Sequence, residues 1–502
     1  MRVTESLVGD MRRKVFAQVA RLAYEGGDYS RLEELPYRII PGETATYRES
    51  IFLERAIVGE RLRLAIGLPL RPLGEHAPLT AGIEESAVAE KYYEPPLVNI
   101  IKFACNACPD RFVVSNCCQG CLAHPCTEIC PKGAISIKGK RSVIDEEKCI
   151  KCGRCRDVCP YNAIIRLERP CAAACGVDAI DSDVHGLASI DYDKCVSCGM
   201  CIVRCPFGAI SDKGQIFQVI HALKTGEEVI AIIAPSFVGQ FGPKVTPGKL
   251  TSALKMLGFS GVAEVAIGAD LCAIEEAKDF LRAVPAEQSF MSTSCCPSCA
   301  VLAKRQFPNL AVNISMALTP MVLTARMQKK EHPDCKIVFI GPCASKKLEA
   351  SRHRIRSNVD FVLTFEELMG IFEAKGVDPA AMEDAEPFRE ATAAGRGFPV
   401  PGGVAEAVAG VIRKLEPERE IKVVSADGLR ECKKMFALAA AGKYDGYLLE
   451  SMACPGGCMA GTGTLLPSKK TSPLVSKYQE EIETKNALDS KHEITLGFLS
   501  GH

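Results

Sequence analysis

The distribution of cysteine is the feature that most restricts what this chain can fold into. Its 502 residues include 26 cysteines: none precedes Cys105, seventeen lie from Cys105 to Cys205, and nine are scattered from Cys272 to Cys458. Disulfides of a secreted protein would be spread in pairs through its loops, whereas clusters at intervals of two or three residues are typical of metal binding. We therefore expect a reduced, intracellular metalloprotein of the cytoplasm.

Charge and hydropathy argue against several other classes of protein. The 61 Lys and Arg balance the 61 Asp and Glu, so electrostatics favours neither a nucleic acid nor a membrane as a partner. No run of about 18 apolar residues is long enough to span a bilayer. Arg12 and Arg13 could begin a twin-arginine signal, but Gln18, Arg21 and Glu25 interrupt the apolar stretch that would follow, which favours an amphipathic helix.

The chain divides into three zones. Residues 1–95 lack cysteine and are predicted to form a helical N-terminal region of unknown role, either a docking module or a helical cap. Residues 96–216 hold the dense cysteines and are predicted to form a double ferredoxin-like α+β domain. In residues 217–502, strand-like apolar runs such as Val229–Ala234, Val262–Ile267 and Lys336–Ile340 alternate with helical patterns, which predicts an α/β domain.

The middle zone contains an internal repeat. Two runs, beginning at Cys149 and Cys195, have the spacing C-x2-C-x2-C-x3-C-P of bacterial ferredoxins. A run beginning at Cys118 has a longer third gap, and Cys171-x3-Cys175 matches the end of a fourth run that lacks its first two members. The pattern is that of a two-cluster ferredoxin unit that occurs twice.

This spacing predicts which cysteines share a 4Fe–4S cubane. Three thiolates come from one tight loop and the fourth comes from the other run. The gaps Cys130 to Cys149 and Cys175 to Cys195 are nearly equal, which favours pairing of neighbouring runs. The predicted cubanes are Cys118, Cys121, Cys126 and Cys159; Cys149, Cys152, Cys155 and Cys130; and Cys195, Cys198, Cys201 and Cys175.

A fourth cubane is left open by the spacing. Cys171 and Cys205 need two more thiolates, which Cys105 and Cys108 could supply. Zinc binding, or no metal at all, is the alternative for Cys105-x2-Cys108. His124 could also be a ligand, although a solvated loop histidine is the more usual interpretation. We therefore expect three or four 4Fe–4S clusters.

Three further cysteine motifs follow residue 290. Their sequences are TSCCPSC at 293–299, GPCASKKLE at 341–349 and ESMACPGGC at 450–458. The second and third motifs follow predicted strands, and open α/β sheets bind their ligands at the carboxyl ends of strands. One such site could consist of buried free cysteines, but three distant motifs together predict a buried, thiolate-bound metal centre.

These motifs resemble the three signature segments of the iron-iron (FeFe) hydrogenases, and the resemblance covers roughly residues 96–500. It implies a two-lobed α/β domain that holds an H-cluster, in which a 4Fe–4S cubane shares one thiolate with a two-iron site carrying CO, cyanide and an azadithiolate bridge. By this resemblance, Cys296, Cys343 and Cys454 would bind the cubane, and Cys458 would also bridge to the two-iron site.

The resemblance also implies roles for side chains around the cluster. Cys295 matches the thiol that passes protons to the bridge amine, and Lys346 matches the lysine that hydrogen-bonds a cyanide ligand. Glu276, Asp279 and Ser315 match a proton relay, and the two acids are spaced to share one helical face. The alternatives are a surface lysine and a solvated, acidic helix end.

Several residues depart from the best-studied members of that family. They include Ser298, Cys299, Met321, Gly341 and residues 461–464 (GTGT). This combination looks more like the branch called group B. The ligands and the thiol donor remain, so these departures bear on catalytic bias, rate and oxygen tolerance.

The predicted function is the reversible interconversion of dihydrogen with protons and electrons. By resemblance, the partners would be a ferredoxin-type electron carrier and the H-cluster maturation enzymes. A hydrogen or redox sensor of the same family and a noncatalytic iron–sulfur assembly scaffold are the alternatives. A sensor would be expected to carry a signalling domain, and a scaffold would not keep Lys346 and the whole ligand set.

Overall fold

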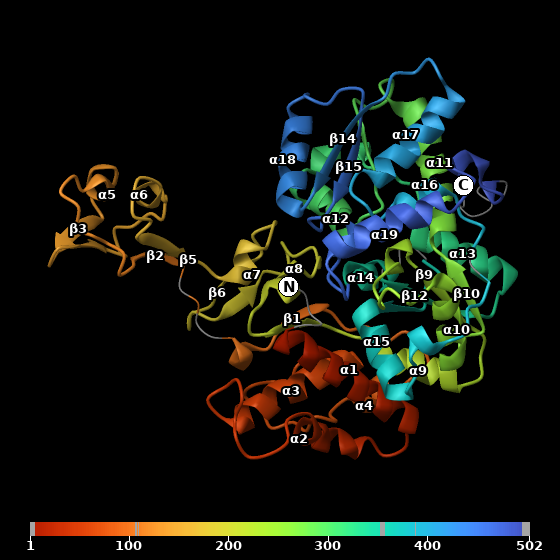
Figure 1. Cartoon of the computed structure of the whole chain (residues 1–502), viewed down its shortest axis with the longest axis horizontal. Helices are drawn as coiled ribbons and strands as arrows, with labels where there is room; N and C mark the ends of the chain where they lie inside the picture. The colour runs from red at the N-terminus through yellow and green to blue at the C-terminus, as the bar shows by residue number, and fades with distance from the viewer. Residues whose placement is uncertain (1–5, 106–107, 109, 352–356, 387, 494–502) are drawn as a thin grey trace.

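A computed structural model of the chain describes residues 6–105, 108, 110–351, 357–386 and 388–493 (Figure 1). Helices at the N-terminus lie beside a large α/β body; of two small ferredoxin-like units, one lies against both and the other projects away from them. None of the described helices combines the length and the apolar composition that a bilayer crossing requires.

The N-terminal region is helical, as predicted. Helix α1 (Leu7–Glu25) begins where the Ser6 hydroxyl accepts the Gly9 N–H at 3.1 Å. Helix α3 (Ile51–Ile66) begins at Ser50 in the same way and ends at Gly67, whose φ of 102° favours glycine. The shorter helices are η2 (Tyr29–Glu34), α2 (Leu35–Ile39) and α4 (Ile83–Ser86).

The two ferredoxin-like units are built from short strand pairs and single helical turns. In the outer unit, β2 pairs antiparallel with β5 and β3 with β4; in the inner unit, β1 pairs with β8 and β6 with β7. The outer elements are β2 (Arg111–Val114), α5 (Pro125–Glu128), β3 (Ile135–Lys138), β4 (Arg141–Ile144), α6 (Arg154–Asp157) and β5 (Ile164–Leu167). The inner elements are β1 (Val98–Ile100), η3 (Lys102–Ala104), α7 (Pro170–Ala173), β6 (Ile180–Ser182), β7 (Ala188–Ile190), α8 (Met200–Arg204) and β8 (Ile210–Asp212).

The two units differ in what they pack against. The outer unit has a small core of its own around Phe112, Ile135 and Ile164, and it projects from the rest of the molecule (Figure 1). The inner unit instead shares a core with the body, where Ile100 and Val177 belong to the same apolar cluster as residues of the second sheet described below. Only the inner unit is therefore built into the body.

The body has two lobes, each formed around a parallel sheet. The first sheet has the order β10-β9-β12-β13 and the second β11-β15-β14. The strands are β9 (Val229–Ile233), β10 (Gly261–Glu264), β11 (Met291–Ser292), β12 (Lys336–Gly341), β13 (Phe361–Thr364), β14 (Lys422–Asp427) and β15 (Tyr447–Met452). Strands β9 and β13 are buried along their whole length, as parallel strands covered by helices on both faces are.

Helices surround both sheets, as expected for an α/β domain. Together with the two small units that precede it, this domain confirms the predicted order of ferredoxin-type units followed by an α/β domain. The longer helices are α9 (Ile216–Lys224), α10 (Pro247–Leu257), α11 (Ala266–Ala283), α12 (Pro297–Gln306), α13 (Pro320–Glu331), α14 (Ser345–Ser351), α15 (Phe365–Lys375), α17 (Gly403–Leu415), α18 (Leu429–Ala440) and α19 (Ser468–Glu480). The shorter ones are η4 (Pro235–Phe237), η5 (Pro308–Asn313), η7 (Pro379–Ala381), α16 (Ala393–Gly397), η8 (Cys458–Ala460) and η9 (Ala487–Asp489). The predicted zone boundaries near residues 95 and 216 stay a prediction.

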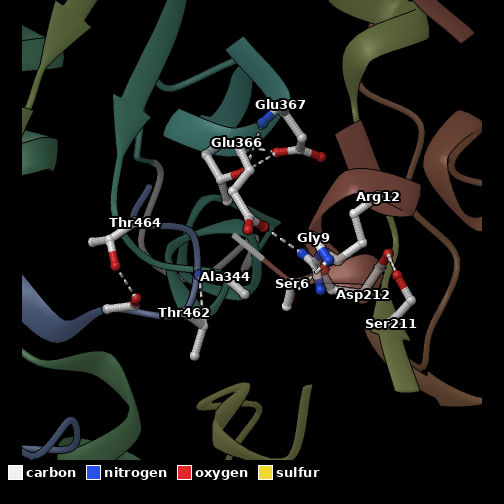
Figure 2. A network of polar contacts seen from close by, with 12 residues as sticks. Ser6, Gly9, Arg12, Ser211, Asp212, Ala344, Glu366, Glu367, Thr462 and Thr464 are labelled. Atoms are coloured by element: carbon white, nitrogen blue, oxygen red, sulfur yellow. Dashed lines mark hydrogen bonds and ion pairs between the residues drawn. The ribbon is translucent and has the colours of Figure 1, made fainter. Parts of the chain in front are cut away.

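Helix α1 packs closely on α15 of the body. A Cβ atom on Gly370 would lie only 2.5 Å from the Cβ of Phe16, so this close approach requires glycine on α15. Beside this contact, Arg12 of α1 pairs with the buried carboxylate of Glu366 at 2.6 Å, and Asp212 lies next to the pair (Figure 2). The N-terminal region thus shares one core with the first sheet.

A second buried ion pair joins the inner unit to the body. The Lys347 ammonium donates to carboxylates of Asp212 on β8 and Glu367 on α15, both at 2.8 Å, and to the Lys213 carbonyl at 3.0 Å. The Lys347, Asp212 and Glu367 side chains are nearly inaccessible to water. Buried charges are tolerated only when they are paired in this way.

We expect Lys347→Ala to lower the free energy of unfolding by about 3–5 kcal/mol, because it leaves two buried carboxylates without a cation. Anaerobic denaturant unfolding measures the change. Lys255→Ala, at an exposed position of α10, is the matched control. Equal stability of the two variants would contradict the expectation.

Candidate functional site

The three cysteine motifs converge on one buried pocket of the body. Cys343 follows β12 and Cys454 follows β15, so both lie at carboxyl ends of parallel strands. Cys296 immediately precedes α12, and Cys458 begins η8. All four line the same pocket. Its remaining wall is largely apolar and includes Ala234, Pro235, Val265, Met321, Phe339 and Phe398.

Glycines let the third motif turn and approach the second. Gly456 and Gly457 have φ angles of 92° and 66°, in the left-handed region that favours glycine. A Cβ atom on Gly461 would lie 2.4 Å from the Pro342 carbonyl oxygen, so the loop after the third motif rests directly on the second. Thr462, one of the residues that depart from the studied relatives, also bridges these loops because its hydroxyl accepts the Ala344 N–H at 3.4 Å (Figure 2).

The four sulfur atoms fit a thiolate-bound iron cluster. Burial raises the pKa of Cys343 and Cys454, and it raises that of Cys458 to about 12. For Cys296 the hydrogen bond from the Cys299 thiol outweighs burial, and its pKa is lowered to about 6. Soft iron centres bind such thiolates, and metal binding supplies the free energy that deprotonates them.

One further thiol lines this pocket, and a buried carboxylate lies near that thiol. Cys295 lines the pocket, and the nearby carboxylate of Glu276 on α11 contributes to raising its pKa, after burial itself. Glu276 is fully buried, and burial raises its pKa to about 7 although the Ser294 N–H donates to it at 3.0 Å. The Ser315 hydroxyl interacts with Glu276 as well. Asp279 lies one helical turn outward and pairs with Arg282 at 2.8 Å.

Lys346 is largely buried near Cys295, with 13% of its side chain exposed, so the alternative of a surface lysine does not describe it. Its ammonium donates to the Cys295 carbonyl at 3.3 Å and to Glu349 at 2.6 Å. The other Glu349 oxygen accepts the Thr319 hydroxyl at 2.7 Å. Although burial opposes the charged form, Glu349 and the neighbouring thiols raise the pKa of Lys346.

Glu349 and Thr319 are site residues that the sequence interpretation missed. The only sequence signal for Glu349 was its spacing of three residues from Lys346 on a helix. Thr319 approaches from a distant segment, so its contact with Glu349 could not be predicted from spacing.

In the outer ferredoxin-like unit, two pockets separate the cysteines as the repeat predicts. One pocket is lined by Cys118, Cys121, Cys126 and Cys159. The other is lined by Cys130, Cys149, Cys152 and Cys155. The fourth cysteine of each set comes from the other run, and His124 is not among the residues that line the first pocket. Each pocket thus brings together the four cysteines of one predicted set, and their role as cubane ligands stays a prediction.

A repeated hydrogen bond marks the last cysteine of each run. The backbone N–H four residues later donates to its sulfur, at 3.2–3.4 Å in all four cases. The donors belong to the alanines that precede the strand isoleucines: Ala134, Ala163, Ala179 and Ala209. Such bonds orient ligands and tune the potential of a cluster.

The inner unit brings a third cysteine set next to the body pocket. Burial raises the pKa of Cys201 well above its usual value, and the neighbouring Cys198, Cys195 and Cys175 raise it further. Cys198 also lines the pocket of the three motifs. The Ser298 hydroxyl of α12 donates to the Val196 carbonyl at 3.0 Å, which holds this loop against the body.

The four remaining cysteines of the inner unit also lie together. Burial, and then the charges of Cys205 and Cys105, raise the pKa of Cys171 to about 12. Cys108 is affected by Cys105 and Cys205 in the same way, while residues 106–107 and 109 lie outside the described ranges. Among the described residues, no three Cys, His, Asp or Glu side chains are close enough together to hold a single metal ion.

Three arginines surround this last set. Arg48 and Arg61 come from the N-terminal region and donate to the carbonyls of Ala104 at 2.6 Å and Gly208 at 2.8 Å. Arg169 donates to the Cys108 carbonyl at 3.4 Å. The N-terminal region therefore contacts the residue just before Cys105 and the segment just after Cys205.

Comparison with known proteins agrees with this arrangement. Residues 227–462 match the family described as "Iron only hydrogenase large subunit, C-terminal domain", and residues 142–165 and 188–211 match "4Fe-4S binding domain". Iron hydrogenase 1 of Clostridium pasteurianum is 30% identical over 384 residues, which are 66% of this chain. The match also spans 66% of that relative, just under two thirds of its length. The periplasmic Fe hydrogenase large subunit of Nitratidesulfovibrio vulgaris is 31% identical over 373 residues, 64% of this chain and 85% of that one.

A solved structure of an apo FeFe-hydrogenase variant from Chlamydomonas reinhardtii aligns with 54% of this chain and 89% of its own, at 22% identity and a TM-score of 0.47. The matched domain and the sequence relatives lead to one conclusion. This chain belongs to the iron-only (FeFe) hydrogenase large subunit family.

Proposed function

We propose that this chain is a hydrogenase that reversibly interconverts dihydrogen with protons and electrons. One observation carries the proposal: the pocket lined by four convergent cysteines is also lined by a further thiol, which a buried carboxylate approaches, and by a cysteine of the inner ferredoxin-like unit. The thiol is Cys295, the carboxylate near it is Glu276, and the inner-unit cysteine is Cys198. A protein that served only as a scaffold would have no use for this thiol and its carboxylate.

Cys296, Cys343, Cys454 and Cys458 would hold the H-cluster, and when bound this group supplies the iron chemistry that makes and breaks dihydrogen. The chain contributes a dry, shaped pocket and fixed donors. Lys346 stays charged beside Glu349 and directs an ammonium toward the wall that contains Cys295. A charge-assisted donor at this place would orient strong acceptors on the cluster.

Protons would move between Cys295 and the surface along α11. A group whose pKa lies near the working pH can both take and give a proton, and the pKa of Glu276 is raised to about 7. Ser315 and Ser294 surround that carboxylate with donors. Asp279 then reaches the half-exposed side of the helix, where Arg282 pairs with it.

Electrons would enter through the outer unit, from a carrier protein of the ferredoxin type. Cys152 is exposed there, and the adjacent Ile150 is 56% exposed. Lys132 and Arg154 flank the same cysteine pocket, and neither forms an ion pair within the described part of the chain. A basic rim around an exposed cluster favours an acidic partner.

Three finer assignments accompany this proposal. Ser298, Cys299 and Thr462 favour the group B branch. None of the 26 cysteines, all of which are described, forms a disulfide, and this favours the reducing cytoplasm. The set Cys105, Cys108, Cys171 and Cys205 would hold a fourth cubane.

The activity is tested on protein matured anaerobically with the H-cluster assembly enzymes. We expect hydrogen evolution from reduced methyl viologen, with CO and cyanide bands in the infrared spectrum. Cys295→Ala should lower kcat at least about 100-fold while the bands persist, because it removes the proton donor. The control is Cys335→Ala, which removes a buried thiol that precedes the amino end of β12, whereas Cys343 of the pocket follows the carboxyl end of that strand. Absence of both activity and bands would overturn the proposal, and full turnover of Cys295→Ala would remove the proton role.

The fourth cubane is tested by counting iron in the matured protein. Four cubanes plus the H-cluster predict about 22 irons per chain, whereas three cubanes predict about 18. Cys171→Ser should lose about four irons with the infrared bands unchanged, and Cys335→Ser should lose none. A wild-type count near 18 would contradict the fourth cluster.

The electron entry site is tested by charge reversal. The double variant Lys132→Glu/Arg154→Glu should raise the KM for an acidic bacterial ferredoxin about tenfold at low ionic strength, since it inverts the charge around the exposed cluster. Activity with methyl viologen should not change. Lys255→Glu on α10 is the control, and an equal effect of the control, or none of the double variant, would place electron entry elsewhere.

A further inference from the structure

Two buried thiols beside the body pocket have no part in the function proposed above. Cys299 lies on α12, one helical turn after Cys296, and Cys432 lies on α18. Their sulfur atoms are 3.7 Å apart, and both side chains are almost completely buried, with 1% and 0% of their surface exposed. Because they come from segments 133 residues apart, the fold itself places these sulfur atoms in contact.

The hydrogen bonds of Cys432 show that it can only accept a hydrogen bond from Cys299. Its thiol donates to the carbonyls of Ala426 at 3.5 Å and Met452 at 3.4 Å. Since a thiol has one proton, the Cys432 sulfur can act toward Cys299 only as an acceptor. Met452 ends β15, two residues before Cys454, so Cys432 is also anchored to the strand that carries the third motif.

Cys299 therefore has two acceptors for its single proton. One is the neutral sulfur of Cys432, and the other is the sulfur of Cys296, with which its thiol also forms a hydrogen bond. A thiolate bound to iron carries negative charge and is a stronger acceptor than a neutral thiol. The Cys299 proton would then point to Cys296, and the contact with the Cys432 sulfur would hold the Cys299 sulfur in position.

We propose that Cys299 is a positioning residue that donates its S–H to the Cys296 ligand and thereby raises the reduction potential of the H-cluster, with Cys432 holding it in place. Reduction adds negative charge to the cluster and its sulfurs, so a donor to sulfur stabilises the reduced state. The inference rests on the proposed function, because it requires an H-cluster at the four cysteines.

Small buried cysteines also serve as ordinary apolar packing. Packing and hydrogen bonding differ in one measurable respect: packing affects stability, whereas the donor affects the potential. Replacement by alanine removes both the volume and the donor, but serine restores a donor of nearly the same size. A potential that falls with alanine and recovers with serine separates the two roles.

The test is infrared spectroelectrochemistry of the matured full-length protein, since CO and cyanide bands report the H-cluster and none of the other clusters. Cys299→Ala should shift the midpoint potential to more negative values, by about 59 mV for a tenfold loss in the preference for the reduced state. Cys299→Ser should return the potential to the wild-type value or above it. Cys432→Ala should shift it in the same direction as Cys299→Ala, by a smaller amount.

Cys335→Ala is the matched control, because it removes an equally buried thiol from a different core. The inference is overturned if wild-type protein shows CO and cyanide bands but the potential of Cys299→Ala equals the wild-type potential. It is also overturned if the potential of Cys299→Ser equals that of Cys299→Ala. Wild-type protein without any CO or cyanide bands would instead overturn the proposed function, so the two failures are distinguishable.

Discussion

Two neighbouring sets of buried ion pairs, those of Lys347 and of Arg12, join the three zones of the chain in one arrangement. The Lys347 ammonium lies at the meeting point of β8, α14 and α15, and its two carboxylates come from the inner ferredoxin-like unit and from the body. The Arg12–Glu366 pair next to it adds the N-terminal helix. Since Lys347 directly follows Lys346, the residue that joins the inner unit to the body also fixes the backbone that presents the ammonium of the candidate site.

This arrangement brings a cysteine of the inner unit and the thiol of Cys295 to the lining of one pocket. Cys198 approaches from the inner unit, and Cys295 with Glu276 approaches from α11. Buried, low-dielectric surroundings strengthen every charge interaction within such a pocket and raise the pKa of its acids. The same burial that makes Cys343, Cys454 and Cys458 poor acids on their own makes their thiolates strongly dependent on bound iron.

Local patterns in the sequence predicted much of this site, whereas the contacts between residues far apart in the chain could not be predicted from the sequence. The cysteines that the spacing grouped in the outer unit line two separate pockets, because each loop encodes its own geometry. Strand-like runs predicted β9 and β12. The run Val262–Ile267 was only half right, since β10 ends at Glu264 and the following residues begin α11. Periodicity and spacing cannot reveal contacts with distant parts of the chain. Such contacts determine the roles of Lys347, Thr319 and Cys432.

The contact between α1 and α15 has a consequence for how the protein is made. Arg12 and Glu366 are 354 residues apart, so at about 5–20 residues per second the ribosome needs roughly 20–70 s to supply the partner of α1. During that interval the apolar face of α1 has no final packing surface, and the ferredoxin-like units emerge before the core they join. Iron insertion into the outer unit can therefore begin on the nascent chain, whereas the body pocket closes only when its last motif has been synthesised.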